Sequence, residues 1–301
     1  MTGFRFRRKF LPVAVMFFAA AAVFAVETEK LADLLPRHSA IAAGADFAAL
    51  CTHPQSAAAF SVLAAQTEKY QVSLGNILYS SDSRCRRSSS LLEFSGSQDV
   101  ANIRQFSGIN DRNIQERSNG ITVYCVNGKP GDRHLLRAAQ LDDRVIGLYM
   151  DYPRKEAFAL DCSGAGVKLR RHIPARKVLF WSAGYPEFSG EPLAALRFFE
   201  TFLENDIDGN LLFHGKVICR NAQDAATAEM FFPLALAVVL KRNFDISPLK
   251  TLRAVSGLKI IRKENVLNFY CTDLSAALEV VSGVVADKLR FPEGGGNEQK
   301  K

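Results

Sequence analysis

Short runs in which apolar and polar residues alternate recur along most of this chain, and they constrain its fold more than any other feature. Successive side chains of a strand point to opposite faces of a sheet, so alternation with a period of two predicts a strand with one buried face. Gly and Pro residues punctuate several of these runs, as expected of turns. We predict strands at 72–79, 91–94, 121–126, 144–150, 156–162, 166–171, 177–181, 211–219, 258–262 and 266–271.

Helical patterns lie between the strand patterns. Apolar residues spaced three and four apart predict a helix, and a Pro or a capping side chain marks where it begins. These signals predict helices at 27–35, 55–69, 100–106, 191–204, 230–240 and 274–289, with a kink or restart at Pro233. The fold class that follows is α+β, with mixed or mostly antiparallel sheet(s) and packed helices.

The chain divides into four predicted segments. They are a signal peptide (1–25), an N-terminal α+β region (26–185), a C-terminal α+β region (186–290) and a disordered tail (291–301). The internal boundary falls in the stretch 184–190, whose Gly, Pro and Ser residues fit a linker or a loop equally well. Faint echoes, Leu91–Gly96 with Leu211–Gly215 and Val123–Cys125 with Phe269–Cys271, leave open two similar subdomains, although chance similarity of apolar strands explains them more simply.

The amino terminus predicts export. Arg5, Arg7, Arg8 and Lys9 precede an apolar run from Phe10 to Ala25, the order of charge and hydrophobicity found in a signal peptide. As a helix the run would be about 24 Å long, shorter than a hydrocarbon core of about 30 Å, so cleavage is favoured over a retained anchor and the mature chain should begin at Val26. We therefore expect a periplasmic or secreted protein without a transmembrane helix.

The export route has two alternatives. The segment Arg7-Arg8-Lys9-Phe10-Leu11 resembles the twin-arginine signal, which carries folded proteins. Phe6 departs from that pattern, where Ser or Thr is commoner, and the apolar run is hydrophobic enough for the general secretory route. We favour the general route.

The charge of the chain argues against nucleic acid as a partner. The formal net charge is +7, but the signal peptide carries four positive charges and no negative ones, which leaves +3 on the mature chain. Phosphate backbones are bound by dense basic patches, which a charge of this size does not supply.

Six cysteines lie in the mature chain, and none of them forms a Cys-x-x-Cys pair. That spacing disfavours a zinc site or a redox centre, and we predict no metal. An even number of cysteines in an exported protein indicates disulfides, here one or two, although the pairing cannot be derived from sequence. The candidates are Cys51, Cys85, Cys125, Cys162, Cys219 and Cys271.

The chain has no Asn-x-Ser/Thr sequon, the acceptor for the N-glycosylation that marks many eukaryotic secreted proteins. Its absence favours a bacterial source.

The common catalytic and nucleotide-binding motifs are absent from the sequence. It has no P-loop, Gly-x-Gly-x-x-Gly, Gly-x-Ser-x-Gly or His-Glu-x-x-His pattern, and we assign no catalytic residue and no cofactor. The leading hypothesis is therefore a non-enzymatic binding or interaction protein. The alternative is a secreted hydrolase whose active site is dispersed along the chain.

One cluster of aromatic and cationic residues is a candidate ligand site. Aromatic rings beside positive charges can line a pocket for an apolar or anionic ligand, although the edge of a core has the same composition. We expect the partner to be another protein or an apolar small molecule. The candidate residues are Trp181, Tyr185, Arg170, Arg171 and His172.

Overall fold

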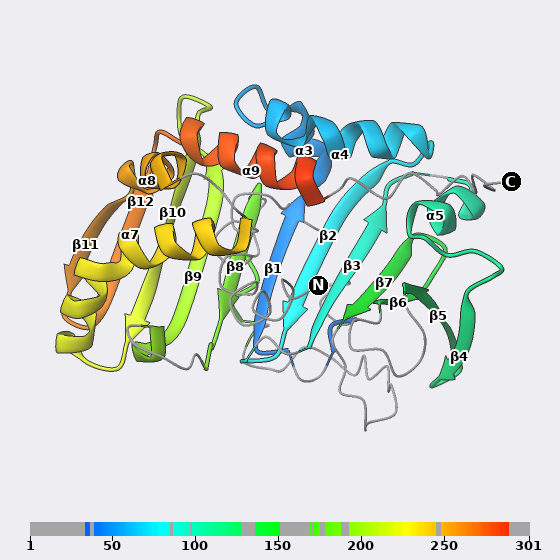
Figure 1. Cartoon of the computed structure of the whole chain (residues 1–301), viewed down its shortest axis with the longest axis horizontal. Helices are drawn as coiled ribbons and strands as arrows, with labels where there is room; N and C mark the ends of the chain where they lie inside the picture. Colours follow the sequence, from blue (N-terminus) through cyan, green and yellow to red (C-terminus); the bar gives the residue numbers. More distant parts are fainter. Residues whose placement is uncertain are drawn as a thin grey trace, which may run out of the picture.

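A single antiparallel sheet of 12 strands organises the chain in a computed structural model, which describes residues 34–36, 39–84, 87–96, 98–127, 136–150, 169, 171–174, 178–187, 193–244 and 248–288. The order across the sheet is β11-β12-β10-β9-β8-β1-β2-β3-β7-β6-β5-β4 (Figure 1). The strands are β1 (Ile41–Asp46), β2 (Leu74–Ser81), β3 (Ser88–Phe94), β4 (Ile114–Ser118), β5 (Ile121–Asn127), β6 (Leu136–Gln140), β7 (Val145–Met150), β8 (Phe180–Gly184), β9 (Leu196–Asn205), β10 (Leu211–Cys219), β11 (Lys259–Lys263) and β12 (Val266–Cys271). The predicted α+β class is confirmed.

Helices pack on one face of this sheet, which we call the helix-bearing face. They are α3 (Phe47–Thr52), α4 (Ala57–Lys69), α5 (Val100–Phe106), α7 (Ala222–Phe244), α8 (Pro248–Ser256) and α9 (Ser275–Lys288), with a short 3-10 turn at Leu193–Ala195 (Figure 1). Phe60 of α4 and Leu278 of α9 share a core with Ala45, Phe180 and Leu203 of the strands. Helix α7 adds a second core on this face, where Phe232 lies near Phe269 of β12.

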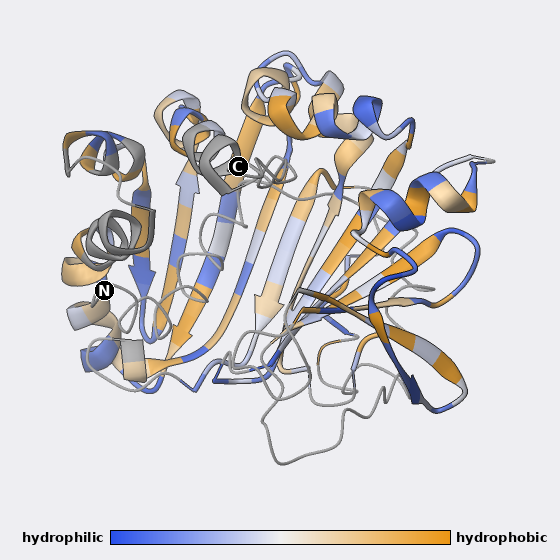
Figure 2. Cartoon of the chain, turned by 45° about the vertical axis from the view of Figure 1, so that its right-hand side comes forward, coloured by the Kyte–Doolittle hydropathy of each residue, from blue (hydrophilic) through white to orange (hydrophobic). Residues whose placement is uncertain are grey.

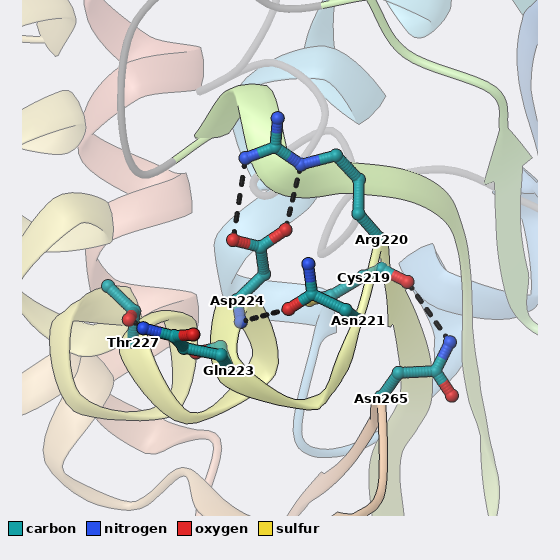
Figure 3. A network of polar contacts seen from close by, with 7 residues as sticks. All are labelled: Cys219, Arg220, Asn221, Gln223, Asp224, Thr227 and Asn265. Atoms are coloured by element: carbon teal, nitrogen blue, oxygen red, sulfur yellow. Dashed lines mark hydrogen bonds and ion pairs between the residues drawn. The ribbon is translucent and has the colours of Figure 1, made fainter.

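The start of α7 is held by local polar contacts. Asn221 accepts a hydrogen bond from the Asp224 backbone N–H at 2.8 Å, and Asp224 pairs with Arg220 at 2.7 Å (Figure 3). The Asn265 side chain donates to the Cys219 carbonyl at 3.1 Å, so the β11–β12 turn is attached to the same corner. A side-chain cap of this kind satisfies an amide that has no partner within the helix. The helix therefore begins well before the predicted residue 230 and continues through Pro233.

The segment predicted as a helix at 191–204 is wrong, because most of it forms strand β9. Leu193, Leu196, Phe199 and Leu203 gave the helical spacing, but Phe199 and Leu203 pair with neighbouring strands on both sides. Phe and Thr favour strands, and Phe198, Glu200 and Phe202 alternate with Phe199, Thr201 and Leu203 at a period of two. Contacts in the sheet thus outweighed the helical spacing.

The other predicted elements agree more closely with the structure. Strand β10 has the predicted bounds, and α4, α5, α9, β11 and β12 match within a few residues. Strand β8 begins three residues after the predicted start. The predicted strand at 156–162, the signal peptide and the tail lie outside the described residues, as do most of the predicted strand at 166–171 and most of the predicted helix at 27–35.

Strand β1 was missed because its composition, Ile-Ala-Ala-Gly-Ala-Asp, has weak strand character. It is nonetheless central, pairing with β2 on one side and β8 on the other. Its glycine has a packing role: a Cβ at Gly44 would lie 2.5 Å from Nε1 of Trp181. The indole lies directly against the backbone of β1, and no larger residue fits there without movement.

The sheet contains strands from both predicted α+β regions. Strand β8 belongs to the N-terminal region and β9 to the C-terminal region, and they pair from Phe180 opposite Leu203 to Gly184 opposite Phe199. Hydrophilic and hydrophobic residues alternate along many of the strands (Figure 2). The alternation leaves one set of side chains on the face opposite the helices, and the candidate site lies there.

Candidate ligand-binding site

The face of the sheet opposite the helices, which we call the second face, changes character across the strands. Across β8, β1, β2 and β3 it is largely buried, with Ala42, Leu78, Leu91 and Trp181 in one core. Among the described residues, Leu35, Leu169 and Val178 from outside the strands complete that core. On β9, Phe198 is buried in the same core, but the other second-face side chains from β9 to β11 are half-buried or exposed. Groups on β9 to β11 can therefore meet another molecule.

A row of aromatic residues crosses this face through consecutive strand pairings. Trp181 of β8 lies opposite Phe202 of β9, which lies opposite His214 of β10, and His214 lies opposite Tyr270 of β12. The Phe202 and His214 ring centroids are 5.4 Å apart. Lys259 of β11 ends the row with its ammonium 5.5 Å from the centre of the Tyr270 ring. We call Phe202, His214 and Tyr270 the aromatic row.

A polar cluster adjoins this row and contains three of the predicted ligand residues. Arg171 donates from Nη2 to the Tyr185 hydroxyl at 2.6 Å and from Nε to Nε2 of His172 at 3.1 Å. The Tyr185 hydroxyl and His172 Nε2 are 2.9 Å apart. Both rings pack on Phe198 of β9, with centroid distances of 4.4 Å for His172 and 5.1 Å for Tyr185. The predicted grouping of Arg171, His172 and Tyr185 in space is therefore present.

Two residues of the sheet complete the cluster. Glu200 of β9 accepts from the ammonium of Lys216 on β10 at 2.6 Å, and its other oxygen lies 3.6 Å from Nδ1 of His172. Glu200 and Lys216 are directly opposite each other, two residues along the strands from Phe202 and His214. We call Arg171, His172, Tyr185, Glu200 and Lys216 the polar cluster. Glu200 was not among the predicted site residues, because its strand was predicted as a helix, although the two-residue alternation of Phe198, Glu200 and Phe202 could have revealed it.

The contacts of His172 indicate a neutral ring. Burial lowers the pKa of His172 below its usual value, and the Arg171 charge lowers it further, against the opposing effect of Glu200. Because Nε2 accepts a hydrogen bond from Arg171, the proton of the neutral ring lies on Nδ1, which faces Glu200. A neutral His172 therefore holds the guanidinium of Arg171 in place.

The other predicted ligand residues are placed differently. Trp181 is 0% exposed and lies in the core next to the row. Its Nε1 donor has no hydrogen-bond partner, in the part of the chain that the structure describes. Arg170 lies outside the described residues.

Four of the six predicted disulfide cysteines are free thiols, namely Cys51, Cys125, Cys219 and Cys271. Geometry explains one of the missing pairings. Cys271 lies opposite Phe213, six positions along β10 from Cys219, which is about 20 Å at roughly 3.3 Å per residue. A disulfide needs Cα atoms within about 7 Å. Cys85 and Cys162 lie outside the described residues, so the predicted disulfides are not confirmed.

Burial also makes these four thiols poor nucleophiles. It raises the pKa of Cys51 to about 11, and it raises the pKa values of Cys125, Cys219 and Cys271.

Within the described ranges, no group of three or more His, Cys, Asp or Glu side chains could hold a metal ion. Nor does any helix there combine the length and the apolar content needed to cross a membrane.

Comparison with known proteins yields structural likenesses only. No protein-family model matches the chain, and no curated protein matches its sequence. Crystal form III of TP0453 aligns with a TM-score of 0.49 and 11% identity over 87% of this chain and 99% of that chain. Crystal form IV aligns with a TM-score of 0.45 and 10% identity, covering 87% and 98% of the two chains. Crystal form I gives 0.44 and 10%, covering 84% and 96%.

Proposed function

We propose that this chain is an exported, non-enzymatic binding protein of the bacterial periplasm or exterior, and that its second face binds an apolar ligand or partner. The observation that carries the proposal is the aromatic row, which stands half-buried beside a polar cluster on strands of a continuous sheet. The charge pattern at the amino terminus supports export. The alternative of a secreted hydrolase gains no support from the four described thiols, because a raised pKa keeps a thiol protonated at neutral pH.

A sheet face suits binding because its side chains are positioned before the ligand arrives. Strands β9, β10 and β12 each pair with a neighbour on both sides, so their backbones are fixed. Ordering fewer groups on association leaves more of the contact energy available for affinity. Phe202 and Tyr270 supply ring surface, and Lys216 and Lys259 keep the rim polar.

The chain contains a single tryptophan, Trp181, which provides an intrinsic reporter for the test. The probe is N-phenyl-1-naphthylamine, an uncharged apolar fluorophore that can accept energy from an excited indole. We expect saturable energy transfer from Trp181. Removing the ring in Phe202→Ala or Tyr270→Ala should weaken binding about tenfold, since burying an aromatic side chain is worth about 1.5–3 kcal/mol when complete.

The matched control is Phe231→Ala, because Phe231 is a partly exposed aromatic residue on α7, on the helix-bearing face. This control should bind the probe as the wild type does. Equal losses in all three variants, or no loss in Phe202→Ala and Tyr270→Ala, would remove the second face as the binding surface.

A further inference from the structure

Arg171 is held in a fixed position although no carboxylate neutralises it among the described residues. Its two hydrogen bonds go to neutral acceptors, the Tyr185 hydroxyl and Nε2 of His172. The residue is exposed, so its guanidinium is accessible to a ligand. An arginine fork of this kind matches the two oxygens of a carboxylate.

The charges of the polar cluster leave a surplus of one positive charge. Glu200 is the one acidic member, and Lys216 compensates it at 2.6 Å. His172 is neutral, so the charge of Arg171 remains. The cluster thus already accommodates one carboxylate, that of Glu200, and presents a cation for a second.

Apolar surface lies beside the cluster along the same strands. On β10, Lys216 stands between His214 and Ile218, and on β9, Glu200 stands between Phe198 and Phe202. Residues two apart along a strand are about 7 Å from each other, so a molecule with a charged end at the cluster reaches the aromatic row with its next few carbon atoms.

We propose that the polar cluster receives the carboxylate of a single-chain amphiphile, with Arg171 as its direct contact, Lys216 as the second cation and the aromatic row along its apolar chain. This inference rests on the proposed function, because it names the ligand class of the same face. His172 and Tyr185 are positioning residues, since they act through Arg171.

The test is displacement of N-phenyl-1-naphthylamine by decanoate, by decan-1-ol and by decyltrimethylammonium. The three compounds share a ten-carbon chain and differ in charge. We expect decanoate to displace the probe at concentrations at least about tenfold lower than the other two, because a hydrogen bond between an ionised donor and an ionised acceptor is stronger than one between neutral groups. Equal displacement by the three compounds would overturn the inference, while binding of the probe at the aromatic row would still support the proposed function.

Variants of the cluster separate recognition from a purely structural role. Arg171→Gln and Lys216→Gln should reduce the preference for decanoate over decan-1-ol, measured within each variant as the ratio of the two displacing concentrations, and Arg171→Lys should retain part of that preference. Glu200→Gln should strengthen decanoate binding, because it removes the competing carboxylate. If Glu200 only stabilised the sheet, its replacement would not strengthen binding. Weaker decanoate binding in Glu200→Gln would count against the inference.

The matched control is Arg253→Gln, because Arg253 is exposed on α8, on the helix-bearing face. It should keep the wild-type preference. Thermal unfolding of each variant confirms folding before binding is measured. A loss of preference in Arg253→Gln equal to that in Arg171→Gln would show that overall charge, and not the cluster, attracts decanoate.

Discussion

The two faces of the sheet are buried by different means. On the helix-bearing face, helices bring apolar stripes to the strands, as Phe60 of α4 and Leu278 of α9 do. On the second face, the described cover over β8, β1, β2 and β3 consists of side chains from outside the strands, such as Leu35, Leu169 and Val178. The contrast indicates that the helix-bearing face mainly serves stability, whereas the second face changes from core to accessible surface at β9, where Phe198 is buried and Phe202 is half-buried.

Trp181 stands at that change, and its removal should have the largest effect. It is fully buried against Gly44, so Trp181→Ala should lower the free energy of unfolding by about 3–5 kcal/mol, the cost of deleting a large buried ring. Denaturant unfolding followed by circular dichroism measures the change, because the variant lacks the fluorescent indole. A loss below about 1 kcal/mol would place the second face at β8 outside the core.

Acidification should destabilise the second face through His172. The folded-state pKa is lowered, so as the pH falls below about 6.5 the unfolded chain takes up the proton first and stability declines through the folded-state pKa. Arg171, Lys216, Glu200 and Tyr185 are the charged and titratable groups that face the ring. His172→Gln should lose less stability than the wild type between pH 7 and pH 5.

This comparison is made by urea unfolding at several pH values, with both proteins first measured at pH 8, where His172 is neutral. Equal slopes against pH in the two proteins would mean that His172 binds its proton equally well in the folded and unfolded states.

The smallest effect is expected on the helix-bearing face, at the ion pair of Arg262 on β11 and Glu229 on α7. The Nε to Oε2 distance is 2.8 Å, but both side chains are more than a third exposed, so solvent screens the attraction. Arg262→Gln should cost no more than about 1 kcal/mol in thermal unfolding. A larger cost would show that solvent screens this ion pair less than its exposure implies.

The strands that were predicted well are those whose own residue pattern is sufficient, without knowledge of the strands that pair with them. Alternation alone was sufficient for β10, whereas β9 also carried a helical spacing that only its pairing with β8 and β10 could overrule. Strand β1 is extended because it pairs with a strand on each side, and its Ala and Gly residues carry no sequence pattern that predicts this pairing.

The candidate site could also be predicted only where its residues are close in sequence. Arg171, His172 and Tyr185 are near one another in sequence and were grouped for that reason. Glu200 and Lys216 join them through strand register, which depends on long-range pairing and cannot be read from either segment alone.

The central position of β1 has a consequence for how the chain acquires its structure. One edge of β1 pairs with β2 soon after it in sequence, but the other edge pairs with β8, about 140 residues later. Until β8 is available, a half-built sheet exposes an unpaired strand at what will become its middle, and such edges invite pairing with other chains. Assembly of the sheet is therefore non-local: the centre of the sheet can form only after more than half of the polypeptide has been synthesised.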